Sequence, residues 1–219
     1  MIFAKIDFIN LLPFYVFIKK NIQSSQIKQI INYKKSYPAK INKQFLKRQI
    51  DAAFISSIAS RNQKTIDLGI VAKSEVLSVL VLNEQEKDDY QSATSNALAK
   101  VLDVKGQVII GDKALKYYYE NKDSLFDDLA SHWVNKYNLP FVFAVLSYNK
   151  NEKYLKNIAN KFKKTKIKIP TYILNQYCKR ADLSQNQIKN YLSKISYDIG
   201  YKEKQSLKLF FKLLKQKGL

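Results

Sequence analysis

Short polar side chains stand where apolar segments of the sequence end, which is where open α/β sheets place the groups that contact a ligand. Asn10 comes directly after the strand predicted over Ile2–Ile9. Ser56 and Ser57 end the buried strand predicted over Asp51–Ser57. Amide and hydroxyl groups can hold a substrate in one geometry through neutral hydrogen bonds. Simpler roles remain open, because Asn often closes a turn and Ser often caps a helix.

A helix start that is rich in hydroxyl groups is a second candidate for ligand contact. Ser92, Thr94 and Ser95 precede an apolar helical run. The free N–H groups and the positive dipole end of such a start favour an anion, for example a carboxylate. Capping by a single hydroxyl explains the pattern equally well. Ser78 lies within the apolar segment Val76–Leu82, where its hydroxyl either bonds a neighbouring carbonyl or lines a cleft.

Gly111 and Asp112 follow the strand predicted over Val108–Ile110. Glycine allows a close approach of the backbone, and capping of the next helix is the role that we expect for Asp112. The only histidine, His132, falls within a predicted helix and is interpreted as structural. The sequence has no glycine-rich phosphate loop, nucleophile elbow or metal-ligand cluster. We therefore expect no metal and no cofactor, and chemistry that depends on neutral donors and on positioning.

The net charge of +20 raises the question of a nucleic-acid partner. Arginine is the side chain preferred for base and phosphate recognition, yet only Arg48, Arg61 and Arg180 stand among the 38 basic residues. No helix-turn-helix, zinc-finger or aromatic RNA-binding signature is present. We interpret the lysines as a solvated surface and expect no nucleic-acid partner. Their positive field would still attract a small anionic substrate.

Cysteine content and hydropathy indicate the compartment. A single cysteine, Cys178, excludes a disulfide framework and fits a reduced cytoplasmic environment. The longest apolar stretch, Phe8–Ile18, is too short to span a bilayer. Asp7 immediately precedes this stretch and no small-residue cleavage site follows it, so we expect neither a signal peptide nor a membrane partner.

The elements that must position these residues alternate between short apolar runs and helical periods, which predicts an α/β fold. The segment after residue 150 is predicted to be entirely helical, with a capping box formed by Ser184 and Gln187. The remaining predicted strands cover 27–33, 66–72, 76–82 and 140–146, and the predicted helices cover 12–20, 38–48, 90–102, 114–119, 125–136, 152–164, 170–180, 184–195 and 203–216.

Two long apolar strands, 76–82 and 140–146, bracket the middle of the chain and suggest crossovers between two lobes. Residues 1–82 and 147–219 would form the larger lobe. Residues 83–146 would form the smaller lobe, including the second crossover strand. A cleft between lobes is a common place for a ligand.

Seven short segments of the chain are distinctive together: Ile9–Phe14, Ile50–Ala53 with Ile55–Ser57, Leu68–Ala72, Val76–Val79, Ser92–Ser95, Ile110–Leu115 and Asp128–Ala144. In this order they resemble the chorismate dehydratase family of menaquinone biosynthesis, in the futalosine route. The resemblance spans residues 1 to about 148 and departs from the family in two places. The segment between Leu102 and Val108 is shorter than in most members, and Ala93 stands where the family has an arginine.

The resemblance implies a two-lobed fold like type II periplasmic binding proteins, with the ligand cleft between the lobes. It implies loss of water from chorismate to give 3-[(1-carboxyvinyl)oxy]benzoate, by a lyase that uses no cofactor. Asn10 and Ser78 match the functional pair of the family. The residues matched to substrate binding are the carboxylate cradle Ser92, Thr94 and Ser95, the opposite wall Ser56 and Ser57, and the strand end Gly111 and Asp112.

Neither Asn10 nor Ser78 is a strong base at neutral pH. Our hypothesis is that the enolpyruvyl carboxylate of the substrate takes the ring proton, with Asp112 as the alternative base. Other functions compete with this one. A non-catalytic small-anion binding protein of the same fold is the main alternative, and the related naphthoate synthase would require a histidine in the cleft. A homodimer is a further expectation that the sequence does not decide.

Overall fold

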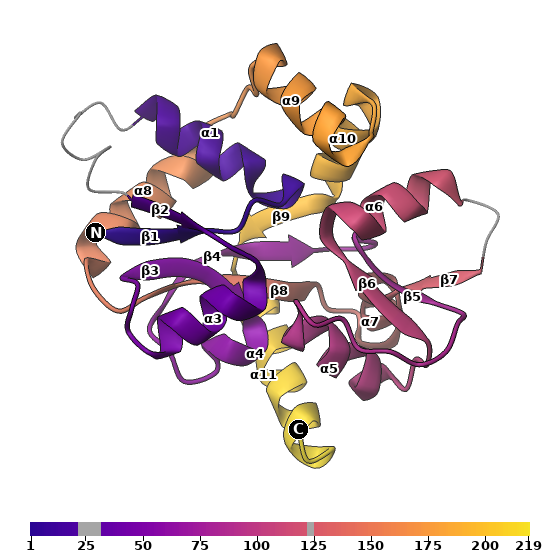
Figure 1. The fold of residues 1–219 in the computed structure, drawn as a ribbon. Helices are drawn as coiled ribbons and strands as arrows, with labels where there is room; N and C mark the ends of the chain where they lie inside the picture. The colour runs from indigo at the N-terminus through magenta and orange to yellow at the C-terminus, as the bar shows by residue number, and fades with distance from the viewer. Residues whose placement is uncertain (22–31, 122–124) are drawn as a thin grey trace.

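The computed structural model describes residues 1–21, 32–121 and 125–219, which build two β-sheets with helices around them (Figure 1). Strand β1 is parallel to both of its neighbours, whereas β8 is antiparallel to both of its own. The larger sheet has the spatial order β2 (Asn32–Lys35), β1 (Ile2–Lys5), β3 (Ala52–Ser56), β8 (Phe141–Tyr148), β4 (Thr65–Ala72) and β9 (Ile195–Asp198). The smaller sheet has the order β6 (Gln107–Ile110), β5 (Val79–Leu82) and β7 (Phe126–Asp128).

Helices cover both sheets, and α9 and α10 lie beside α6 of the smaller lobe (Figure 1). None of the helices in the described part of the chain is long and apolar enough to cross a bilayer. The helices are α1 (Leu12–Asn21), α3 (Pro38–Leu46), α4 (Ser57–Ser60), α5 (Ala93–Leu102), α6 (Gly111–Glu120), α7 (Leu129–Tyr137), α8 (Glu152–Lys164), α9 (Thr171–Ala181), α10 (Gln185–Lys194) and α11 (Tyr201–Gln216), with a 3₁₀ turn, η1, at Ile9–Leu11.

The core of the larger lobe is aromatic and is centred on β3 and β8. Every residue of β3 is buried, as expected for a central strand with helices on both faces. The ring of Phe14 on α1 packs edge-to-face on Phe54 of β3 and on Phe162 of α8, with centroids 5.0 and 5.3 Å apart. These contacts fix α1, and with it the turn η1 that carries Asn10, against the sheet.

Several predicted boundaries were wrong, each for a local reason. Strand β1 ends at Lys5, because the chain turns into η1 before Asn10. The helix predicted from Leu125 begins at Leu129, because the Asp128 side chain accepts hydrogen bonds from the N–H groups of Ala130 and Ser131 and so caps it. The strand predicted over 27–33 lies largely outside the described residues.

The final block is not entirely helical, because β9 adds an edge strand to the larger sheet beside β4. The two crossover strands also differ from the expected lobe boundaries: β5 belongs to the smaller sheet and β8 to the larger one. The two-lobed α/β fold that the sequence predicted is confirmed. The cleft between its lobes is where the polar strand and helix ends meet.

Candidate active site

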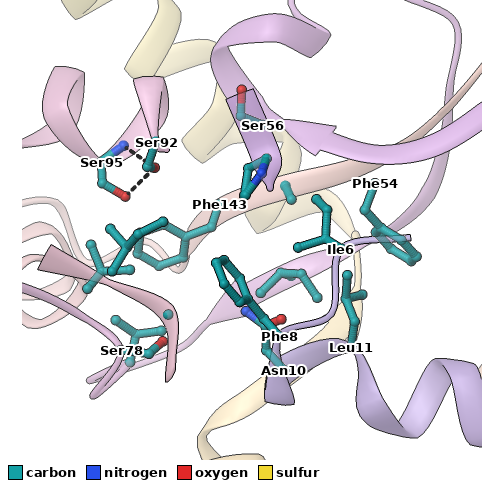
Figure 2. Close-up of a pocket in the computed structure, with 17 residues that line it drawn as sticks. Ile6, Phe8, Asn10, Leu11, Phe54, Ser56, Ser78, Ser92, Ser95 and Phe143 are labelled. Atoms are coloured by element: carbon teal, nitrogen blue, oxygen red, sulfur yellow. Dashed lines mark hydrogen bonds between the residues drawn. The ribbon is translucent and has the colours of Figure 1, made fainter. Parts of the chain in front are cut away.

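A pocket lies between the two lobes, and both sheets contribute to its wall (Figure 2). The space that the centre of a water-sized sphere can occupy inside it is about 70 Å³, enough for several water molecules. Its polar wall is formed by Asn10, Ser56, Ser78, Ser92, Ser95 and Gly111. Its apolar wall includes Ile6, Phe8, Leu11, Phe54, Ile70 and Phe143.

The polar groups sit at two ends of the pocket. Asn10 and Ser78 lie near one end, Ser92 and Ser95 lie near the other, and the ring of Phe143 points into the space between them (Figure 2). A ligand that suits this arrangement has an apolar, flat centre and polar groups at separate positions on its edge.

Asn10 is held by the C-terminal part of the chain. The hydroxyl of Tyr197, on β9, donates a 2.7 Å hydrogen bond to the backbone carbonyl oxygen of Asn10. The hydroxyl of Tyr191, on α10, lies 2.8 Å from the Ser78 Oγ, and the Asn10 side chain lowers the pKa of this hydroxyl against the effect of burial. Tyr191 is therefore the physical link between the two residues that the sequence singled out.

Ser78 lies at the point where the chain enters the smaller lobe. It precedes β5 and follows Leu77, whose φ of 60° is in the left-handed region that residues other than glycine rarely adopt. Asp128 Oδ2 stabilises this turn by accepting hydrogen bonds from the N–H groups of Val76 at 3.0 Å and Leu77 at 2.7 Å. The Gly111 N–H donates to the Ser78 carbonyl oxygen at 2.8 Å, so the backbone of Ser78 is held from two sides.

The serines at the start of α5 face the pocket with their hydroxyl groups joined. Ser92 is the N-cap and accepts a hydrogen bond from the Ser95 N–H at 3.2 Å, while the two hydroxyl oxygens are 2.8 Å apart. Thr94, by contrast, does not line the pocket. Its Oγ1 accepts a hydrogen bond from the Ile58 N–H at 3.1 Å, so it joins α5 to α4 across the cleft.

The two serines at the junction of β3 and α4 also face different surroundings. Ser56 lines the pocket, and the Asn42 side chain fixes it by donating to its Oγ at 2.8 Å and accepting from its N–H at 3.1 Å. Ser57 is fully buried and its hydroxyl donates to the Val142 carbonyl oxygen. The binding role predicted for Ser57 therefore has no support from its position, whereas Ser56 is placed to contact a ligand.

Gly111 and Asp112 begin α6 but face different surroundings. Gly111 has φ of 69° and packs so closely on Phe8 that an added Cβ would lie 2.8 Å from the ring. The expected capping role of Asp112 was wrong. Its carboxylate instead accepts hydrogen bonds from the Ile9 N–H at 3.0 Å and from Arg180 at 2.7 Å, outside the pocket wall.

Asp112, Arg180 and Asp7 form an ionic cluster that joins the lobes behind Asn10. Arg180 donates to Asp7 Oδ2 and to Asp112 Oδ2, each at 2.7 Å. Burial raises the pKa of the Asp112 carboxyl, while the Ile9 N–H and the charge of Arg180 act in the opposite direction. Burial likewise acts to raise the pKa of Asp7, but hydrogen bonds from Lys35 and Tyr177 and nearby positive charges hold it far below its usual range.

The pocket wall itself carries no titratable side chain among the described residues that line it. His132 is exposed on α7 and pairs with Asp127 at 2.7 Å, away from the cleft. The arrangement can therefore orient a ligand and stabilise developing charge through hydroxyl, amide and backbone N–H groups. A proton acceptor would have to come from the ligand or from a group outside the described wall.

Tyr191 and Tyr197 were not predicted as site residues from the sequence. Both occur in a segment whose apolar spacing indicated only packing, and Tyr191 follows Ile188 by three residues on the buried face of α10. A buried tyrosine usually needs a hydrogen-bond partner for its hydroxyl, and this requirement was the one indication in the sequence that these tyrosines do more than pack. The sequence could not name the partners, because they lie more than 100 residues away.

Comparison with known proteins identifies the family. A family model described as menaquinone biosynthesis matches residues 1–107 and 89–216 of the chain. A curated chorismate dehydratase from Campylobacter jejuni subsp. jejuni serotype O:23/36 (strain 81-176) is 49% identical over 223 residues, covering all of both chains. The chain belongs to the chorismate dehydratase family of menaquinone biosynthesis.

Solved structures with low sequence identity share the fold of this family member. Protein AF1704 from Archaeoglobus fulgidus aligns with a TM-score of 0.69 at 12% identity, covering 99% of this chain and 97% of its own. An ABC transporter structure from Parabacteroides distasonis aligns with a TM-score of 0.59 at 15% identity, covering 99% and 92%. At these identities the likeness concerns the arrangement of the two lobes.

Proposed function

We propose that the chain is a chorismate dehydratase, a carbon–oxygen lyase that converts chorismate into 3-[(1-carboxyvinyl)oxy]benzoate and water without a cofactor. The observation that carries the proposal is a pocket that pairs Asn10 with Ser78 at one end and a serine-lined helix start at the other, with no titratable side chain in its described wall. The full-length relative that is named chorismate dehydratase supports the choice of substrate.

Chorismate matches the two-ended polarity of the pocket because it is a dianion with a largely apolar cyclohexadiene ring. One carboxylate would accept hydrogen bonds from Ser92, Ser95 and the free N–H groups at the start of α5, where the helix dipole favours negative charge. The cyclohexadiene ring would lie beside Phe143 and Phe8. Ala93 leaves this end without the arginine of the family pattern, so we assign the recognition to hydroxyl and backbone donors.

The reaction breaks one C–H bond and one C–O bond of the ring. The carbon that carries the ether loses its proton, the neighbouring carbon loses its hydroxyl, and the electron pair of the C–H bond completes the aromatic ring. The proton and the hydroxyl leave as water, so no oxidant or reductant is needed. Because aromaticity supplies the driving force, the protein mainly has to hold one reactive conformation.

The enolpyruvyl carboxylate of chorismate is the base in this proposal. It is linked to the ether oxygen and can reach the proton on the same ring carbon when the side chain is folded back. Asn10 would hold this folded conformation, and Ser78 would donate a hydrogen bond to the departing hydroxyl. A positioned donor of this kind is worth about 10²–10³ in kcat.

Asp112 is the competing base, and its contacts argue against it. Both carboxylate oxygens have partners, since Oδ1 accepts from the Ile9 N–H and Oδ2 accepts from Arg180. Asp112 does not line the pocket, so its carboxylate would have to break both hydrogen bonds and move before it could accept a proton from a bound substrate. We therefore assign Asp112 to holding the lobes together.

The test is incubation of the purified protein with chorismate, following the aromatic product by absorbance and the loss of water by mass. We expect Asn10→Ala and Ser78→Ala each to reduce kcat by about 10²–10³ with little loss of stability. Near-normal turnover in either variant would refute its assigned role. Loss of turnover in Asp112→Asn, with melting temperature and binding unchanged, would favour Asp112 as the base.

The same experiment separates the enzyme from a small-anion binding protein. Chorismate that binds and is recovered unchanged would support the binding protein. A cytoplasmic location and a homodimer stay predictions, to be checked by cell fractionation and by light scattering of the full chain.

A further inference from the structure

Tyr191 occupies a central position behind the pocket although it does not line it. Its side chain is 1% exposed, and α10, which carries it, begins at a complete capping box and contacts η1. Its hydroxyl oxygen lies 2.8 Å from the Ser78 Oγ, and the Asn10 side chain also acts on this hydroxyl by lowering its pKa against the effect of burial. A single hydroxyl from the larger lobe thus joins two groups that reach the pocket from different elements.

Proton counting restricts how these three groups can be arranged. The phenol of Tyr191 has one proton, so it can donate to one partner and must accept from the other. If it donates to Ser78, then the Asn10 amide donates to Tyr191, and the Ser78 proton is free to point into the pocket. If it donates to Asn10, then the Ser78 hydroxyl donates its own proton to Tyr191 and can act toward the pocket only as an acceptor.

We propose that Tyr191 is a positioning residue, which accepts a hydrogen bond from the Asn10 amide and donates one to the Ser78 Oγ, so that Ser78 presents its proton to the departing hydroxyl of the substrate. This role rests on the dehydratase function proposed above. No proton passes along the chain of hydrogen bonds, because Tyr191 only fixes the orientation of the other two groups.

The surroundings of Tyr191 suit a neutral and immobile phenol. Burial raises the pKa of its hydroxyl, so the proton that the arrangement needs stays in place at neutral pH. Tyr197 holds the other side of the same turn through the Asn10 carbonyl oxygen at 2.7 Å. The turn η1 is therefore held by two tyrosine hydroxyls from consecutive elements, α10 and β9.

The test uses Tyr191→Phe, which removes the hydroxyl and keeps the ring. We expect kcat for chorismate to fall about 10- to 100-fold, the usual range for a residue that orients a group in contact with the substrate, with KM changed less than threefold. The matched control is Tyr148→Phe. Tyr148 is also a buried tyrosine, and its hydroxyl bonds Glu152 outside the pocket, so turnover should not change.

A double-mutant cycle distinguishes positioning from general stability. If Tyr191 acts through Ser78, then Tyr191→Phe should reduce kcat by a clearly smaller factor in a Ser78→Ala background, where only the orientation of Asn10 remains to be lost. An equal loss in both backgrounds, or unchanged kcat in the single variant, would overturn the proposal. If the unmodified protein gives no aromatic product, the proposed function fails as well, and that result is separate from an active protein that tolerates Tyr191→Phe.

Discussion

Replacing Asp128 by asparagine should release the turn that presents Ser78. The two oxygens of the Asp128 carboxylate have separate tasks: Oδ1 caps α7 through Ala130 and Ser131, and Oδ2 accepts from the N–H groups of Val76 and Leu77. Asparagine keeps the shape but has only one acceptor oxygen. Whichever way the amide is turned, two backbone N–H groups lose their acceptor and face an NH₂ group.

The size of the effect follows from these contacts. A hydrogen bond to an ionised acceptor contributes about 1.5–3 kcal/mol, so two lost bonds cost about 3–6 kcal/mol. Burial raises the pKa of Asp128, and removing a buried charge offsets part of this loss. We expect a net destabilisation of about 2–4 kcal/mol, which leaves a typical domain folded and lowers Tm by about 4–16 °C.

Activity should fall as well, because Leu77 is held in a conformation that costs about 1–2 kcal/mol and will relax once Asp128 lets it go. Thermal unfolding and chorismate turnover measured on the same preparation would check both effects. Asp127→Asn is the control, since Asp127 is half-buried and its side chain pairs only with His132 among the described residues, and a surface change of this kind stays within about 0.5 kcal/mol. Equal melting temperatures for the two variants would refute this account of the turn.

Two further substitutions test the contacts between the lobes. Gly111→Ala should destabilise the protein by at least about 1–2 kcal/mol, because φ is 69° and the new Cβ would meet the Phe8 ring. Urea unfolding measures this loss, and Gly218→Ala is the control because Gly218 has a similar φ of 72° but open space around it. Equal losses of stability in the two variants would exclude a contribution from the Phe8 clash. The pKa of Asp7 is lower in the folded state than in the unfolded state, so Asp7 contributes stability that is present above the unfolded pKa and is lost as the pH falls below about 4. Asp7→Asn should therefore lose less stability on acidification than the unmodified protein does. Melting temperatures from pH 7 to pH 2 check this, with the exposed Asp67→Asn as control.

The sequence predicted the position of the site better than the direction of its side chains. Polar residues at the ends of strands and helices meet in one cleft because the topology brings those ends together, and Asn10, Ser56, Ser78 and Gly111 do line one pocket. Their roles in binding and catalysis stay predictions.

Side-chain direction depends on details that a run of polar residues does not reveal. Successive residues of a helix start point about 100° apart, so Ser92, Thr94 and Ser95 cannot all face one ligand, and Thr94 turns to α4. Ser57 points away from the pocket because it is the first residue of α4, and its hydroxyl donates to the Val142 carbonyl oxygen of β8. The edge strand β9 was missed because its residues follow α10 without a turn signal and gain their partners only from β4.

A neutral pocket explains why its polar residues are so heavily supported. Catalysis by orientation is lost when a donor can rotate, and a hydroxyl or an amide carries no charge that would draw it to the substrate from a distance. Four polar groups of the pocket wall meet this requirement through a second contact. Asn42 fixes Ser56, Ser95 fixes Ser92, and tyrosines of the C-terminal segment fix Ser78 and Asn10. In the proposed mechanism the segment after residue 150 supports the chemistry through Tyr191 and Tyr197 although these residues do not line the pocket, and substitutions there should affect kcat before KM.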